Sequence, residues 1–159
     1  MAVEVRPGVW SEVFAGIDAQ AKVKGSKLLE LIAQALEKQA KINASTGSHK
    51  YGTPTPARPG AGPAVISGTL RRSLTHEPVR MLGPGHWQTR VGTGVGAYPS
   101  YGSSTSRTPA NKYGYYLEHG LRNGAKFPFL VPAFRHVTGT GVSAIYREIY
   151  GAASWKKVT

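Results

Sequence analysis

The chain has 159 residues and a formal net charge of +12, from 20 Lys and Arg against 8 Asp and Glu. This length predicts a single domain over 1–159, and the absence of cysteine excludes disulfides and thiolate metal sites. No apolar run reaches the roughly 20 residues that span a bilayer, and the start lacks a secretory pattern, so we expect no membrane contact.

The positive charge belongs to the part of the chain that follows residue 37. Residues 1–37 contain five acids and four bases, whereas residues 38–159 contain three acids and sixteen bases. Such a surface attracts polyanions, either nucleic acid or an acidic protein face. Because no motif specifies a nucleic-acid-binding fold, any contact with DNA is expected to be electrostatic, independent of base sequence and weakened by salt.

Residues 11–42 are predicted to form a long amphipathic helix. Gly25 interrupts it and indicates either a kink or the close approach of another backbone. The simplest role for this helix is to cover one face of a sheet. Its apolar positions recur at three- and four-residue steps: Phe14, Ile17, Ala21, Leu28, Ile32, Ala35 and Leu36.

Residues 43–63 are rich in Gly, Pro, Ser and Thr and lack apolar periodicity, which predicts a long loop. Loops of this length are commonly functional or become ordered on a partner. The next segment, 64–74, predicts a turn of helix capped by Ser67, with Arg71 and Arg72 projecting from it.

An antiparallel hairpin is expected over 77–94, with Gly83-Pro84-Gly85 as its turn. Its second strand alternates Trp87, Thr89, Val91 and Thr93, which is typical of a half-buried strand.

The glycines that follow the hairpin formally match a dinucleotide-binding pattern through Gly92, Gly94 and Ala97. We reject this match because Tyr98-Pro99-Ser100 stands where a helix must begin. Residues 99–112 instead predict a second long, basic loop.

The C-terminal third is expected to be helical around a rigid centre. Residues 113–121 predict two turns of helix ended by Gly120 as a left-handed cap. Pro128 and Pro132 predict extended backbone around apolar side chains, which form a plug in the core. A last helix is expected over 133–150, interrupted at 139–141, with 151–159 as a frayed tail. The fold class is therefore α+β.

Glu118 and His119 are the residues that most suggest an active site, but the sequence favours a structural role for them. Only Glu77 and Glu148 accompany Glu118 in the basic part, and the five histidines show no metal-binding spacing. We expect Glu118 to pair with an arginine, and we expect no catalytic residue, cofactor or metal.

Three motifs in order resemble the head–tail joining, or tail-completion, proteins of long-tailed double-stranded DNA phages. That family shows patterns like T-G-x-L-R-x-S, Y-A-x-x-x-E-x-G and P-F-L-x-P-A. Residues 67–73 are similar to the first, with Gly68, Leu70, Arg71 and Ser73 in register. Tyr113 or Tyr115 through Glu118 and Gly120 is similar to the second, and residues 128–133 match the third. The resemblance covers about 12–150 and departs from the family at the lengthened basic loops, 43–63 and 99–112.

The resemblance implies a non-enzymatic virion protein, made in the host cytoplasm and assembled as a sixfold or twelvefold ring in the phage neck. Its partners would be further copies of itself, the connector and tail proteins, and packaged DNA contacted without sequence preference. Alternatives are a tail-terminator ring of the same neck, a small basic nucleic-acid-binding protein, and, more remotely, a cell-wall hydrolase. The residues expected at interfaces are Tyr51, Arg58, Arg71, Arg72, Tyr98, Tyr101, Arg107, Lys112, Tyr116 and Glu118.

Overall fold

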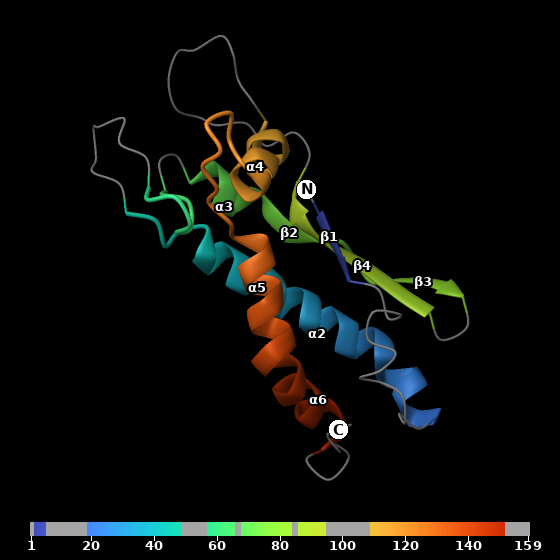
Figure 1. Ribbon diagram of the computed structural model, residues 1–159. Coiled ribbons are helices and arrows are strands. Elements are labelled where there is room, and N and C mark those ends of the chain that lie inside the picture. Colours follow the sequence, from blue (N-terminus) through green and yellow to red (C-terminus); the bar gives the residue numbers. More distant parts are fainter. Residues whose placement is uncertain are drawn as a thin grey trace.

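The computed structural model describes residues 2–5, 19–48, 57–65, 68–83, 86–94 and 109–151, with side chains from residue 24 onward. The fold is mixed α+β, as expected: a long helix packs on a small antiparallel sheet and on a C-terminal helical segment (Figure 1). None of the helices in these ranges is long and apolar enough to cross a membrane. The elements are β1 Ala2–Val5, α2 Ala19–Asn43, α3 Thr69–Ser73, β2 Leu74–His76, β3 Arg80–Gly83, β4 His86–Thr93, α4 Ala110–His119, α5 Leu130–His136, the π-helical turn η2 Val137–Gly141 and α6 Val142–Tyr150.

Strand β4 is the centre of the sheet, and the other three strands all pair with it in antiparallel fashion. The hairpin expected over 77–94 is confirmed as β3 and β4. The alternation along β4 is confirmed too, since Thr89, Val91 and Thr93 are buried and Trp87 is half-buried. Strand β1, which lies along β4 from Ala2 to Val5, was not expected from the sequence.

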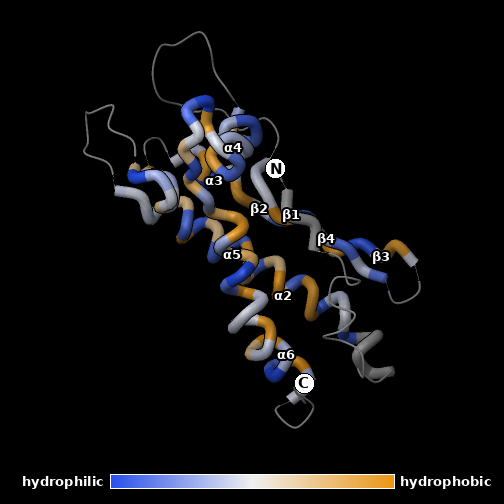
Figure 2. The backbone as a smooth tube through the Cα atoms, viewed as in Figure 1, coloured by the Kyte–Doolittle hydropathy of each residue, from blue (hydrophilic) through white to orange (hydrophobic). Residues whose placement is uncertain are grey.

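Helix α2 lies between the sheet and the C-terminal helices, so it is buried on two sides rather than on one (Figure 1). The helix runs through Gly25 without a break. An added Cβ there would lie 3.6 Å from Trp87 Cδ1, so a side chain, and not another backbone, approaches this position. Figure 2 shows the apolar stretches of α2 and α5 against each other where the two helices cross. The buried residues of α2 are Leu28, Leu29, Ile32, Ala33, Leu36 and Ala40.

The sequence predicted the interruption of the C-terminal helix correctly, but it predicted the first residue of that helix wrongly. The break expected at 139–141 is a π-helical turn, η2, between α5 and α6. The extended backbone expected around Pro132 is wrong, because α5 already begins at Leu130. Pro132 therefore sits in the first turn of the helix, where its missing N–H leaves no intrahelical hydrogen bond unmade. The core plug is confirmed by Phe127 and Phe129, which are both buried.

Helix α4 begins three residues earlier than expected, at Ala110, so the second long loop cannot extend to residue 112. The helix ends at Gly120, as predicted, and the Gly120 N–H donates to the Tyr116 carbonyl at 2.8 Å. Gly120 does not adopt the left-handed helical conformation, because its φ of 132° and ψ of 140° describe an extended backbone with positive φ. A side chain at this φ would be strained, which explains a glycine here.

The first long loop is closed at its base. The Gly47 N–H donates to the Pro63 carbonyl at 3.3 Å, and Ala44 and Ala57 on the two sides of this contact are buried. The middle of the loop, 49–56, lies outside the described residues, as do Ser67, the start of the first helix at 11–18, the loop segment 95–108 and the tail 152–159. The expected N-cap at Ser67 is wrong, because α3 begins at Thr69 and its N-cap residue is Gly68, which has no side chain to cap the helix.

Candidate functional site

The carboxylate of Glu118, near the end of α4, binds the start of α5. Its Oε2 accepts hydrogen bonds from the N–H groups of Phe129 and Leu130 at 2.9 and 3.0 Å, and its Oε1 accepts one from Val131 at 2.9 Å. The first amides of a helix have no partner within the helix and carry the positive end of its dipole, so a carboxylate stabilises them. The expected arginine partner of Glu118 is therefore wrong, and the partner is backbone.

Gly114, one turn before Glu118, allows α4 to approach three other elements closely. A Cβ at this position would lie 3.2 Å from Leu70 Cδ1 on α3, 3.3 Å from Thr93 Cγ2 on β4 and 3.7 Å from Phe129 Cζ. Leu70, Gly114 with Glu118, and Phe129 come from the three motifs of the sequence, one after the other. The motifs thus meet in one buried contact, which we call the joint and define by Leu70, Gly114, Glu118 and Phe129.

The other side of α4 carries exposed aromatic side chains. Tyr115 and Tyr116 are 49% and 42% exposed, and their rings meet edge to face with centroids 5.9 Å apart. The His119 ring lies 4.4 Å from that of Tyr115, and Leu121 just beyond the helix is also exposed. We call Tyr115, Tyr116, His119 and Leu121 the α4 face. Large, amphipathic and partly exposed rings of this kind are enriched where proteins contact one another.

Of the residues expected at interfaces, five are exposed and one is not. Arg58 lies in the turn after Ala57, Arg71 and Arg72 lie on α3, and Lys112 and Tyr116 lie on α4. Glu118 is only 6% exposed, so the prediction that it contacts a partner is wrong: burial against α5 excludes it from the surface. The remaining four residues are outside the described part of the chain: Tyr51, Tyr98, Tyr101 and Arg107.

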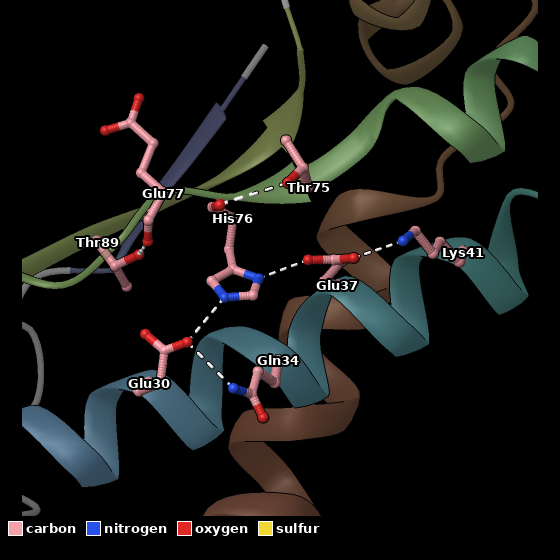
Figure 3. A network of polar contacts seen from close by, with 8 residues as sticks. All are labelled: Glu30, Gln34, Glu37, Lys41, Thr75, His76, Glu77 and Thr89. Atoms are coloured by element: carbon pink, nitrogen blue, oxygen red, sulfur yellow. Dashed lines mark hydrogen bonds and ion pairs between the residues drawn. The ribbon is translucent and has the colours of Figure 1, made fainter.

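Sequence reasoning missed a network of charged groups between β2 and α2, in which His76 lies between two carboxylates (Figure 3). Its Nδ1 lies 2.5 Å from Glu37 Oε2, and its Nε2 lies 2.9 Å from Glu30 Oε1. Glu37 also pairs with Lys41, one turn further along α2. A carboxylate only accepts, so both ring nitrogens must donate, which requires the protonated, positively charged imidazole.

One part of this network has a signal in the sequence. Glu30 and Glu37 are seven residues apart, which places them on the same face of a helix. Their partner is 46 positions beyond Glu30, and the sequence has no feature that connects a strand residue to these two acids.

The pKa values of the network shift in opposite directions. Partial burial lowers the pKa of His76, but hydrogen bonds to Glu37 and Glu30 and the charges of both acids outweigh it, so the pKa lies above its ordinary 6.5. Burial raises the pKa of Glu37, but hydrogen bonds and charges of Lys41 and His76 bring it below its ordinary 4.5. Both shifts favour the ion pair.

This pairing predicts a stability contribution that depends on pH. The raised pKa of His76 adds stability below pH 6.5 that is lost as pH rises through the folded pKa, while the lowered pKa of Glu37 adds stability above pH 4.5 that is lost on acidification. We expect His76→Gln to reduce the free energy of unfolding more at about pH 5.5 than at about pH 8.5. Urea unfolding at both values measures this, with exposed His86→Gln as the control. An equal effect of His76→Gln at both pH values would contradict the ion pair.

Within the described ranges, no group of three or more His, Asp or Glu is arranged to hold a metal ion.

Because the comparisons with known proteins find no match, the function has to be inferred from the geometry of the structure. No family model, curated protein or solved structure matches this chain.

Proposed function

We propose that this chain is a structural, non-enzymatic protein of the neck of a long-tailed phage, where a sixfold or twelvefold ring of copies joins the head connector to the tail. The observation that carries this proposal is the joint. The segment richest in chemically active residues has its one acid bound to three backbone amides and only 6% exposed. A carboxylate in this position holds two helices together and does not reach a substrate.

Two exposed surfaces support an assembly role. The α4 face presents two tyrosines and a leucine, and the hairpin presents Met81 and Leu82, which are 63% and 65% exposed. Clustered exposed apolar side chains mark sites of protein contact. A ring subunit needs at least two such surfaces, one for each neighbour.

The excess of positive charge supports a place beside packaged DNA. Arg58, Arg72 and Lys112 are exposed, and no carboxylate of the described residues forms an ion pair with Arg58 or Lys112. Exposed cations of this kind attract the phosphate backbone without reading the bases.

The test is to delete the gene from its phage and to examine the lysate by electron microscopy. For a joining protein we expect DNA-filled heads and tails of normal length that remain separate, because both assemble without it and only their connection is missing. Complementation with the wild-type gene should restore virions. Tails of abnormal length would instead favour the tail terminator. Heads without DNA, or normal virions, would contradict a role in the neck, as would the loss of a cell-wall hydrolysing activity.

A second complementation experiment, with a variant gene, tests whether the exposed α4 face is needed for assembly. The double substitution Tyr115→Ala with Tyr116→Ala should leave the fold intact and yet yield few joined particles, because it removes the two exposed rings of the α4 face. The matched control is Tyr150→Phe, which keeps the ring at a position on α6 away from that face. Normal particle yield from the double variant would exclude the α4 face as an assembly surface.

A further inference from the structure

A groove of about 690 Å³ is lined by the C-terminal half of α2, the turn that follows it, Arg71 on α3 and His76 at the end of β2. Its volume lies within the range of pockets that hold small ligands or single peptide segments. Ile42 on α2 lines it and is 49% exposed, so the groove has an apolar side chain that a ligand can cover. Ser45 and Thr46 line it as well, but their hydroxyls donate to the carbonyls of Lys41 and Asn43.

The charged side chains of the groove are nearly all positive. Lys38, Lys41, Arg71 and His76 line it, and Glu37 is its one acid. Both oxygens of Glu37 are already engaged, one by Lys41 and the other by His76. Lys38 and Arg71 have no ion-pair partner among the described residues, so the groove keeps two positive charges for a ligand.

We propose that this groove binds an acidic peptide segment of another protein, with an aliphatic or aromatic side chain over Ile42 and carboxylates beside Lys38 and Arg71. The lysine stems add apolar wall beneath their charged ends, which suits such a segment. A phosphate backbone fits less well, because it would cover Ile42 with a charged, hydrated group, whereas a peptide can place an apolar side chain there. The guanidinium group of Arg71 can donate two parallel hydrogen bonds to one carboxylate, which suits such a ligand.

A second copy of this chain offers no acidic segment. The eight acids of the sequence are scattered, with no two closer than the six positions between Glu12 and Asp18. Among the acids with described side chains, Glu30 and Glu37 hold His76, Glu118 is buried and Glu77 pairs with Arg80 at 3.9 Å. Glu148 is then the one exposed carboxylate of this group that has no ion pair among the described residues, and a single carboxylate does not make an acidic segment. An acidic partner is therefore a different protein. The proposal goes beyond the neck function and does not depend on it, because the ligand chemistry follows from the groove alone.

The test uses the isolated protein and a fluorescein-labelled peptide in which glutamates flank a leucine and a phenylalanine. Fluorescence anisotropy at about 0.15 M salt measures the dissociation constant. We expect the double substitution Lys38→Gln with Arg71→Gln to weaken binding about tenfold, because it removes both unpaired cations. Ile42→Ala should weaken it about fivefold through the loss of apolar contact. In methyl NMR spectra of the wild-type protein, addition of the peptide should shift the Ile42 signals.

The matched control is Arg135→Gln with Arg147→Gln, which lowers the net charge equally at exposed positions on α5 and α6 and should change binding less than about twofold. If the control weakens binding as much as the groove variant, the attraction is general and the groove is not a site. A peptide with glutamine in place of glutamate should not bind. If a labelled DNA duplex loses affinity selectively in the groove variant while the peptide does not, the groove takes nucleic acid and the proposal is overturned.

Discussion

Replacement of Glu118 by alanine is expected to lower the free energy of unfolding by about 3 kcal/mol or more. The substitution leaves the amides of Phe129, Leu130 and Val131 without their acceptor, and the first two bonds are buried. An unsatisfied buried donor costs about 1–3 kcal/mol, and hydrogen bonds to a charged group are stronger than neutral ones. The start of α5 also loses the negative charge that its dipole favours. Urea unfolding followed by circular dichroism measures the effect.

Two further variants separate the cap from a general effect of charge. Glu118→Gln keeps one acceptor oxygen but turns an NH2 group toward a backbone donor, so we expect roughly half the loss that alanine causes. Glu148→Ala removes a carboxylate at an exposed position of α6 and should change stability by less than about 0.5 kcal/mol. If Glu118→Ala behaves like Glu148→Ala, the carboxylate does not hold the joint.

Phe129→Ala should destabilise the fold by about 3–5 kcal/mol, because it empties a fully buried position at the centre of the joint. The ring packs near Gly114, and the residue's backbone is held by Glu118 through its N–H and by Asn43 through its carbonyl, the latter at 3.1 Å. These contacts prevent the neighbouring elements from collapsing into the space. The cost should therefore stand at the upper end of the range.

Leu82→Ala serves as the control for Phe129→Ala, since Leu82 is 65% exposed on β3 and its truncation should be almost neutral. Thermal unfolding of the two variants beside the wild type measures the difference. A melting temperature of Phe129→Ala close to that of Leu82→Ala would mean that the joint is not part of the cooperative core.

The sequence by itself determined the local elements whose pattern is written in neighbouring residues. The periodicity of apolar side chains predicted the long helix. The alternation of Trp87, Thr89 and Val91, together with the Gly-Pro-Gly sequence at 83–85, predicted the hairpin. The two glycines at 139 and 141 marked the interruption of the C-terminal helix. Each of these features depends on residues that lie within a few positions of one another, so the sequence alone is sufficient to predict it.

The tertiary structure alone decided what the polar side chains do. Glu118 was expected on an arginine at the surface, and instead it caps a helix 11 positions further along. The cap could not be predicted because the prolines at 128 and 132 favoured extended backbone, while Pro132 in fact stands in a first helical turn, where proline is tolerated.

The same holds for His76 and for Gly114. His76 lies between two acids only because α2 passes beneath β2, and Gly114 is needed only because α3, β4 and Phe129 meet α4 there. The energy of such contacts comes from groups far apart in the chain, whose distance is set by the packing of whole elements and not by any local preference. A residue's conformation can thus be predicted from its neighbours, whereas its partner is known only once the elements have packed.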